Sequence, residues 1–144
     1  METLQEMMKK VLADTFAMYL KAHNYHWNVE GIHFSQFHDF FGELYTELHD
    51  SVDPIAEQIR ALDTYAPGSF TRFMELTDIE DETTIPMCQE MAQRLLADNE
   101  KVLATLNMSF KLAEEFDKQG LVDFIAGRID VHNKHGWMLR SISK

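Results

Sequence analysis

The chain has 144 residues and a mass of 16.8 kDa, which fits a single domain spanning residues 1–144. Its composition is 45% hydrophobic and 26% charged, as in folded globular proteins, and its one cysteine excludes a disulfide framework. Six glycines and three prolines are too few for the many tight turns of an all-β sandwich or barrel. The net charge of -11 argues against direct DNA binding and favours attraction of cations.

The sequence contains no recognisable targeting or membrane segment. Its first ten residues mix charges and lack the apolar core of a secretory signal peptide. No apolar run approaches the roughly 20 residues needed to span a bilayer. We therefore expect a cytoplasmic protein with no membrane association.

The first half of the chain predicts two long helices, because apolar residues recur at three- and four-residue spacing. The first covers residues 4–28, and its predicted apolar face consists of Met8, Leu12, Phe16, Tyr19, His23 and Trp27. Gly31 then favours a chain reversal. The second covers residues 34–62, and its predicted face consists of Phe34, Phe37, Phe41, Leu44, Leu48, Val52, Ile55, Ile59 and Leu62.

Residues 63–82 are predicted to form a long connection with a short helix near residues 70–76. The acidic run at 78–82 is interpreted as a solvated loop, with cation binding as the alternative. A third long helix is predicted to start near Thr84 and to end at Gln119-Gly120, and a fourth follows it. Two hairpins joined by a long crossover predict an all-α fold, the ferritin-like form of the four-helix bundle.

Carboxylates on the second helix are candidate metal ligands. Asp53 and Glu57 are four residues apart and share one helix face, in a row that also contains Tyr45 and His49. Carboxylate and imidazole together bind iron, manganese or zinc. An alternative is that Asp53 caps a helix that begins at Pro54.

Two histidines are the other candidate ligands. His38 lies fifteen residues before Asp53 on the same helix, roughly 22 Å along its axis, which is too far to share an ion. His26, at the end of the first helix, can fold back beside His38 across the turn. If two copies of the second helix pack antiparallel about a two-fold axis, each histidine pair meets the carboxylates of the other copy. A di-iron site inside one bundle would need Glu-x-x-His on two helices, but the only such motif, residues 30–33, lies in the predicted turn.

These motifs resemble the Dps-type miniferritins of the ferritin-like superfamily. The resemblance rests on the segment His23–Gly31, on His38 and on the segment Asp53–Glu57, and it continues through Pro67 and residues 78–80 and resumes at 136–139. It implies a hollow dodecameric cage that oxidises Fe(II) with peroxide or oxygen, stores the ferric iron and acts in oxidative stress. Zinc or manganese can occupy such a site.

The resemblance also implies the roles of individual residues. His26 and His38 match the metal ligands, and hence the catalytic residues, that come from one subunit, while Asp53 and Glu57 match those that come from its partner. Trp27 matches the aromatic residue beside the site. A further match is Asp123 of the last helix, which either lines a pore at a three-fold axis or is an exposed carboxylate favoured by the helix dipole.

The chain departs from the family pattern at two places. Gly42 stands where the family carries an acidic residue, four positions after the second histidine. The alternative function is therefore a metal-binding or structural cage that has lost efficient ferroxidase turnover. The Lys-rich tail of DNA-binding members is also missing, since Lys9 and Lys10 fall within the predicted first helix, so DNA contact would need bridging divalent cations. A helical interaction module with incidental histidines is the remaining interpretation.

Overall fold

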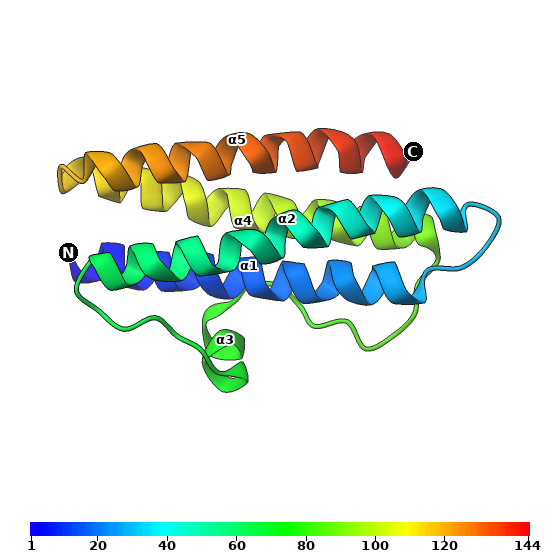
Figure 1. Ribbon diagram of the computed structural model, residues 1–144, viewed down its shortest axis with the longest axis horizontal. Coiled ribbons are helices and arrows are strands. Elements are labelled where there is room, and N and C mark those ends of the chain that lie inside the picture. Colours follow the sequence, from blue (N-terminus) through cyan, green and yellow to red (C-terminus); the bar gives the residue numbers. More distant parts are fainter.

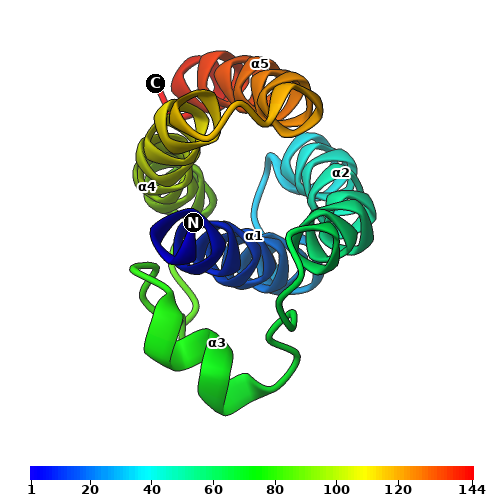
Figure 2. The same cartoon turned by 90° about the vertical axis from the view of Figure 1, so that its left-hand side faces the viewer.

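The computed structural model describes all 144 residues, which form five α-helices and no strand. Four long helices lie side by side in a bundle (Figure 1): α1 spans Glu2–Asn28, α2 Phe34–Ala61, α4 Cys88–Glu115 and α5 Gln119–Ile142. The short helix α3, Phe70–Leu76, lies outside the bundle against α1 (Figure 2). The predicted all-α bundle with a short helix in its crossover is confirmed. No helix is both long enough and apolar enough to cross a membrane.

The crossover from α2 to α4 runs the length of the bundle, because α2 ends at one end and α4 begins at the other (Figure 1). A buried carboxylate, Asp14 of α1, fixes its middle. One Asp14 oxygen accepts hydrogen bonds from the Thr77 hydroxyl (2.7 Å) and the Asp78 backbone N–H (3.0 Å). The other accepts from Thr105 of α4 at 3.0 Å and from Lys10 at 2.9 Å. These bonds satisfy a charge that would otherwise be costly to bury.

The acidic run at 78–82 is not simply a solvated loop, as the sequence had suggested. Glu82 points inward and accepts hydrogen bonds from the Tyr25 hydroxyl (2.6 Å) and from Arg94 of α4 (2.5 Å). Burial alone would raise the pKa of Glu82, but the bonds from Tyr25 and Arg94 lower it to about 2. The end of the crossover is therefore held to both α1 and α4.

Helix α2 continues through Pro54, so the alternative in which a helix begins there is wrong. Pro54 lies on the exposed face of α2. It removes the hydrogen bond to the Asp50 carbonyl, but that carbonyl belongs to an exposed residue and can bond to water. Asp53 therefore projects from the middle of a helix and does not cap one.

Helix α4 begins later and ends earlier than the sequence pattern indicated. Its first residue is Cys88, because the Thr84 backbone N–H and hydroxyl both bond to Glu82 and Met87 is still extended, with ψ of 157°. It ends at Glu115, and Gln119-Gly120 starts α5. The chain reverses at Asp117, whose φ of 55° is in the left-handed region.

The apolar face predicted for α1 is only partly the buried face. Met8 and Leu12 are buried, but Tyr19 and His23 are half-buried and Trp27 is 60% exposed. Each four-residue step advances about 40° around a helix of 3.6 residues per turn, so a series of such steps leaves the core. The buried face alternates steps of three and four residues: Leu4, Met8, Val11, Thr15, Met18, Ala22 and Tyr25.

Candidate metal centre

The turn between α1 and α2 brings His26 and His38 together, as predicted. Gly31 makes this turn possible, with a φ of +117° that only glycine adopts freely. The two imidazole rings are stacked, with centroids 3.8 Å apart and planes 19° from parallel. Each Nδ1 lies 2.7 Å from the backbone carbonyl oxygen of the other histidine.

These reciprocal hydrogen bonds determine how the histidines can act. A carbonyl oxygen only accepts, so Nδ1 must be the donor in both rings, and Nε2 of each ring has no partner within the chain. A backbone carbonyl bound to the far nitrogen is the usual support of a metal-ligating histidine, because it fixes the tautomer and the ring orientation. The geometry of His26 and His38 therefore leaves Nε2 of each ring as the atom that can coordinate a metal.

Gly42 is in contact with the ring of His26. A Cβ at this position would lie 3.1 Å from both Cε1 and Nδ1 of His26, closer than ordinary van der Waals contact. The missing side chain leaves the space in which the His26 ring lies against α2. A side chain at position 42 would therefore displace the ring that His38 holds by its carbonyl oxygen.

The two predicted carboxylate ligands lie farther along α2. Asp53 and Glu57 are exposed and share one face of the helix. No three His, Cys, Asp or Glu side chains of the chain lie close enough together to hold a metal ion. A single chain thus brings two of the four predicted ligands together and leaves the other two apart from them.

Aromatic and imidazole rings surround the histidine pair. His23 is stacked between Tyr45, at 3.8 Å and 7° from parallel, and Trp27, at 3.9 Å. Tyr45 in turn lies 5.1 Å from His26, measured between ring centroids. Burial, together with the neighbouring His26 and His49, lowers the pKa of His23, so this imidazole is neutral near pH 7.

The two late histidines belong to a polar network between α2, α4 and α5. Glu47 of α2 accepts hydrogen bonds from Arg128 (2.5 Å) and His135 (2.8 Å) of α5. Burial alone would raise the pKa of Glu47, but the bonds from His135 and Arg128 lower it to about 2. His132 is buried against Asn99, and burial lowers its pKa well below the usual value. These hydrogen bonds hold the three helices together.

Comparison with known proteins identifies the family. Residues 5–144 match the family model described as a ferritin-like domain. A Bacillus anthracis protein named DNA protection during starvation protein 2 is 31% identical over 136 residues, which cover 94% of this chain and 93% of that protein. The chain is a Dps-type member of the ferritin-like family.

Solved structures of Dps proteins superpose closely on this chain. Dps from Bacillus brevis matches with a TM-score of 0.94 and 26% identity, over 99% of this chain and 96% of that chain. A Dps protein from Vibrio cholerae O1, described as a member of a broad superfamily of ferritin-like diiron-carboxylate proteins, matches with a TM-score of 0.95 and 26% identity, over 99% and 90% of the two chains. The predicted fold and the predicted resemblance are both confirmed.

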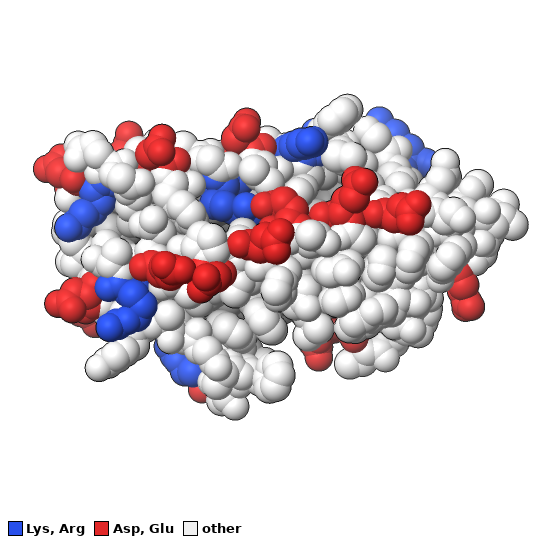
Figure 3. Space-filling view, in the orientation of Figure 1, with Lys and Arg blue, Asp and Glu red and all other residues white.

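Acidic side chains follow the exposed side of α2 in this Dps-type chain. Figure 3 shows them as a band across the front of the molecule, over the helix labelled α2 in Figure 1. The exposed acidic residues of α2 are Asp39, Glu43, Asp50, Asp53 and Glu57. The face that carries the candidate ligands is therefore anionic and attracts divalent cations.

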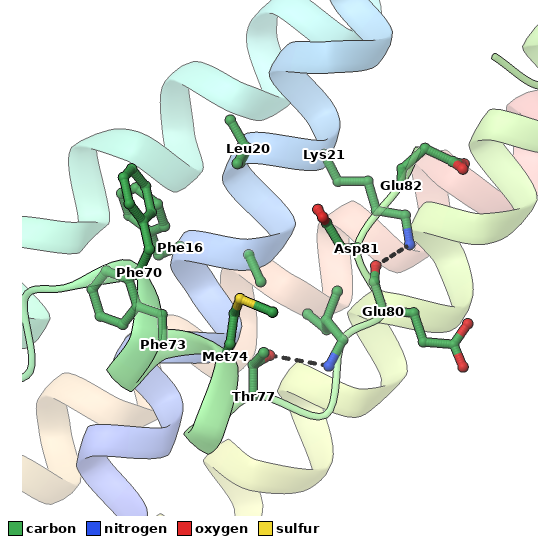
Figure 4. A pocket seen from close by; sticks show the side chains of 12 residues that line it. Phe16, Leu20, Lys21, Phe70, Phe73, Met74, Thr77, Glu80, Asp81 and Glu82 are labelled. Carbon is green, nitrogen blue, oxygen red and sulfur yellow. Dashed lines mark hydrogen bonds between the residues drawn. The ribbon is translucent and has the colours of Figure 1, made fainter. Parts of the chain in front are cut away.

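An apolar groove of about 300 Å³ lies elsewhere, between α1 and α3. Figure 4 shows Phe16, Leu20, Phe73 and Met74 around it, and the rings of Phe16 and Phe73 stack at 4.8 Å. The groove lacks the paired histidines and carries its few charged groups at one edge. The groove therefore shares helix α1 with the candidate metal centre but is lined by different residues.

Sequence reasoning missed the hydrogen bond between the Tyr19 hydroxyl and Nδ1 of His23, 3.0 Å long. Both residues had been placed on an apolar helix face. Their four-residue spacing was the available signal, because side chains at that spacing meet on one helix face. The role of Glu47 was also missed, since its partners lie 81 and 88 residues away in the chain.

Proposed function

We propose that this chain binds Fe(II) and oxidises it at metal sites formed between two copies of the chain. The observation that carries the proposal is the histidine pair, in which both Nδ1 atoms are committed to backbone carbonyls and both Nε2 atoms remain free. A backbone carbonyl on the far ring nitrogen is the usual support of a histidine that binds a metal.

The site is completed by Asp53 and Glu57 of the second copy. Both carboxylates are exposed, and roughly 22 Å of helix separates Asp53 from His38 within one chain. A two-fold axis that sets two α2 helices antiparallel brings each histidine pair to the carboxylates of the other copy, so that one interface holds two identical sites. The catalytic and metal-binding residues of the proposal are thus His26, His38, Asp53 and Glu57.

Iron is the substrate of this reaction. Two imidazoles and two carboxylates bind Fe(II) and leave coordination positions open for an oxidant, either hydrogen peroxide or oxygen. With Gly42 in place of an acidic side chain, we propose one firmly held iron per site. The ferric product is stored inside a dodecameric cage of this chain, and zinc or manganese competes for the same ligands.

Large exposed apolar side chains mark the surface that further copies cover. Leu20 is 40% exposed, Phe70 76% and Met74 73%, and all three border the groove between α1 and α3. Exposed apolar surface of this kind is typical of an interface between subunits. Asp123 is exposed and lies beyond the first turn of α5, where the helix dipole has little effect. A position lining a pore of the cage is therefore the role we propose for it.

The ligand assignment is tested by alanine substitution. Asp53→Ala or Glu57→Ala should abolish fast Fe(II) oxidation after anaerobic loading and addition of peroxide, followed by absorbance of the ferric product. Circular dichroism should be unchanged, because both side chains are exposed and contribute nothing to the core. The matched control is His49→Ala, on the same row of α2, which should reduce the rate much less. A larger loss in His49→Ala would place the metal within one helix.

The assembly is tested by light scattering combined with metal titration. The unaltered protein should form one large closed oligomer, and a Phe70→Glu or Met74→Glu variant that separates it into single chains should lose tight metal binding while its helical content remains. Monodisperse chains near 17 kDa that still bind Fe(II) tightly would contradict a site shared between copies.

A second candidate function is a cage that binds metal without efficient turnover. The observation in its favour is Gly42, which removes one acidic ligand. Tight Fe(II) binding by the assembled protein, with an oxidation rate no faster than that of free Fe(II), would select this alternative. Fast oxidation selects the first proposal.

A further inference from the structure

Tyr19 has a base within hydrogen-bond reach. Its hydroxyl lies 3.0 Å from Nδ1 of His23, and its ring is half-buried. On the other side, Phe16 packs edge-on against Tyr19, with ring centroids 5.6 Å apart, and Phe73 stacks on Phe16. A phenol gives up an electron readily only when its proton can leave at the same time, and this pair supplies both the donor and the proton acceptor.

A continuous series of rings joins Tyr19 to the candidate metal ligands. Tyr45 lies 6.2 Å from Tyr19 and 5.1 Å from His26, both measured between ring centroids. His23 stacks on Tyr45 at 3.8 Å. These separations are short, so an electron can pass from Tyr19 to His26 in steps between neighbouring rings.

A site that holds one iron has to obtain an electron from elsewhere. Reduction of hydrogen peroxide to water takes two electrons, and one Fe(II) supplies one. With only that electron, peroxide splits into hydroxide and a hydroxyl radical. Because Gly42 stands where the family pattern has an acidic residue, the proposed site has one acidic ligand fewer than that pattern. A second electron source near His26 would supply the electron that a second iron would otherwise provide.

We propose that Tyr19 is a redox-active tyrosine that supplies this second electron, with His23 as its proton acceptor; this rests on the proposed function. Fe(II) gives one electron to peroxide and becomes Fe(III). Tyr19 gives the other electron and passes its hydroxyl proton to His23, leaving a neutral tyrosyl radical and an imidazolium. The O–O bond breaks, and with two protons from solvent the two oxygens leave as two water molecules.

The tyrosine is restored by a second Fe(II). That ion gives one electron to the tyrosyl radical and becomes Fe(III), while the proton on His23 returns to the phenolate oxygen. Over the cycle two Fe(II) and one peroxide, with two protons, give two Fe(III) and two waters. No hydroxyl radical is released, although the site holds one iron at a time.

The test is electron paramagnetic resonance on the assembled protein. The oligomer is loaded with Fe(II) without oxygen, mixed with hydrogen peroxide and frozen. The expected result is a tyrosyl signal whose hyperfine structure narrows when ring-deuterated tyrosine is incorporated. Tyr19→Phe keeps the ring and its packing but removes the phenol, so it should lose this signal and release hydroxyl radical that a spin trap captures.

Three control variants keep the radical assignment specific. Tyr65→Phe removes a phenol that is 81% exposed and outside the ring cluster, and the tyrosyl signal should persist. The signal should also persist in Tyr45→Phe and in Trp27→Phe, because both substitutions retain a ring.

Three results would overturn the inference. A tyrosyl signal that survives in Tyr19→Phe, or that disappears only in Tyr45→Phe or Trp27→Phe, assigns the electron to another residue. Iron oxidation without any tyrosyl signal in the unaltered protein overturns this inference alone. Failure of the unaltered protein to oxidise iron overturns the proposed function as well.

Discussion

The imidazole of His26 lies against a glycine, and this contact connects one residue of α2 to the chemistry of the site. Its Nδ1 is held by the His38 carbonyl, so the ring has little freedom to move away from position 42. The proximity of the two histidines could be predicted from the turn between their helices. Their reciprocal bonds could not, because they depend on the rotamers and on where the turn places each carbonyl.

Gly42→Ala and Gly127→Ala form a matched pair of helix substitutions. An added Cβ at Gly127 meets nothing within 4 Å, so this variant should gain about 1 kcal/mol of stability from helix propensity. At Gly42 the Cβ would lie 3.1 Å from the His26 ring, so Gly42→Ala should gain less and bind Fe(II) more weakly. Urea unfolding and anaerobic Fe(II) titration measure the two effects. Equal stabilisation with unchanged affinity would show that the His26 ring moves freely.

Gly42→Asp adds a ligand at the same position. The His26 ring has to shift by a few tenths of an ångström, but a carboxylate then stands beside His38. We expect a second Fe(II) per site in the same titration and a faster oxidation. Unchanged stoichiometry would mean that another side chain already fills the second position.

At the scale of helices, the sequence predicted the long elements and the short helix at residues 70–76, whose bounds agree with α3. Their periodicity and the Pro67-Gly68 break are local signals. The start of α4 could not be predicted, because Thr84 is held out of the helix by Glu82, and Glu82 is positioned by Tyr25 and Arg94. These long-range contacts overrule the local preference for a helix start before Pro86.

The ion pairs of Glu47 make the contact between α2 and α5 sensitive to acid. Because folding lowers the pKa of Glu47 from 4.5 to about 2, its stabilising effect is present above pH 4.5 and is lost as the pH falls toward 2. Glu47→Gln should therefore be less stable near pH 7 and lose less stability than the unaltered protein across that interval. Urea unfolding at a series of pH values measures this. Glu43→Gln, an exposed control one turn earlier, should follow the unaltered protein.

At the scale of the whole molecule, the anionic character of the α2 face depends both on the net charge of the chain and on where its acidic side chains lie. The charge of -11 was evident in the sequence, but its concentration along the exposed face of α2 depends on which side of the helix faces the core (Figure 3). The proposed site could be predicted only in halves, since within one chain Asp53 and Glu57 lie apart from His26 and His38.

The same charge affects contact with nucleic acid, and it predicts that the chain does not bind DNA directly. Lys9 and Lys10 lie within α1, and Lys10 is already paired with Asp14 and Asp78. Binding to DNA needs phosphate neutralisation by cationic groups, and the proposed cage of chains that each carry -11 would repel the phosphate backbone. In a gel-shift assay with plasmid DNA and a chelator, the assembled protein should leave the plasmid's mobility unchanged even at low salt, where screening is weakest. The matched control is the same assay with added Mg²⁺ in place of the chelator, because a divalent ion can bridge carboxylate and phosphate. A salt-sensitive shift with the chelator present would show a cationic surface that the chain's charge distribution does not provide.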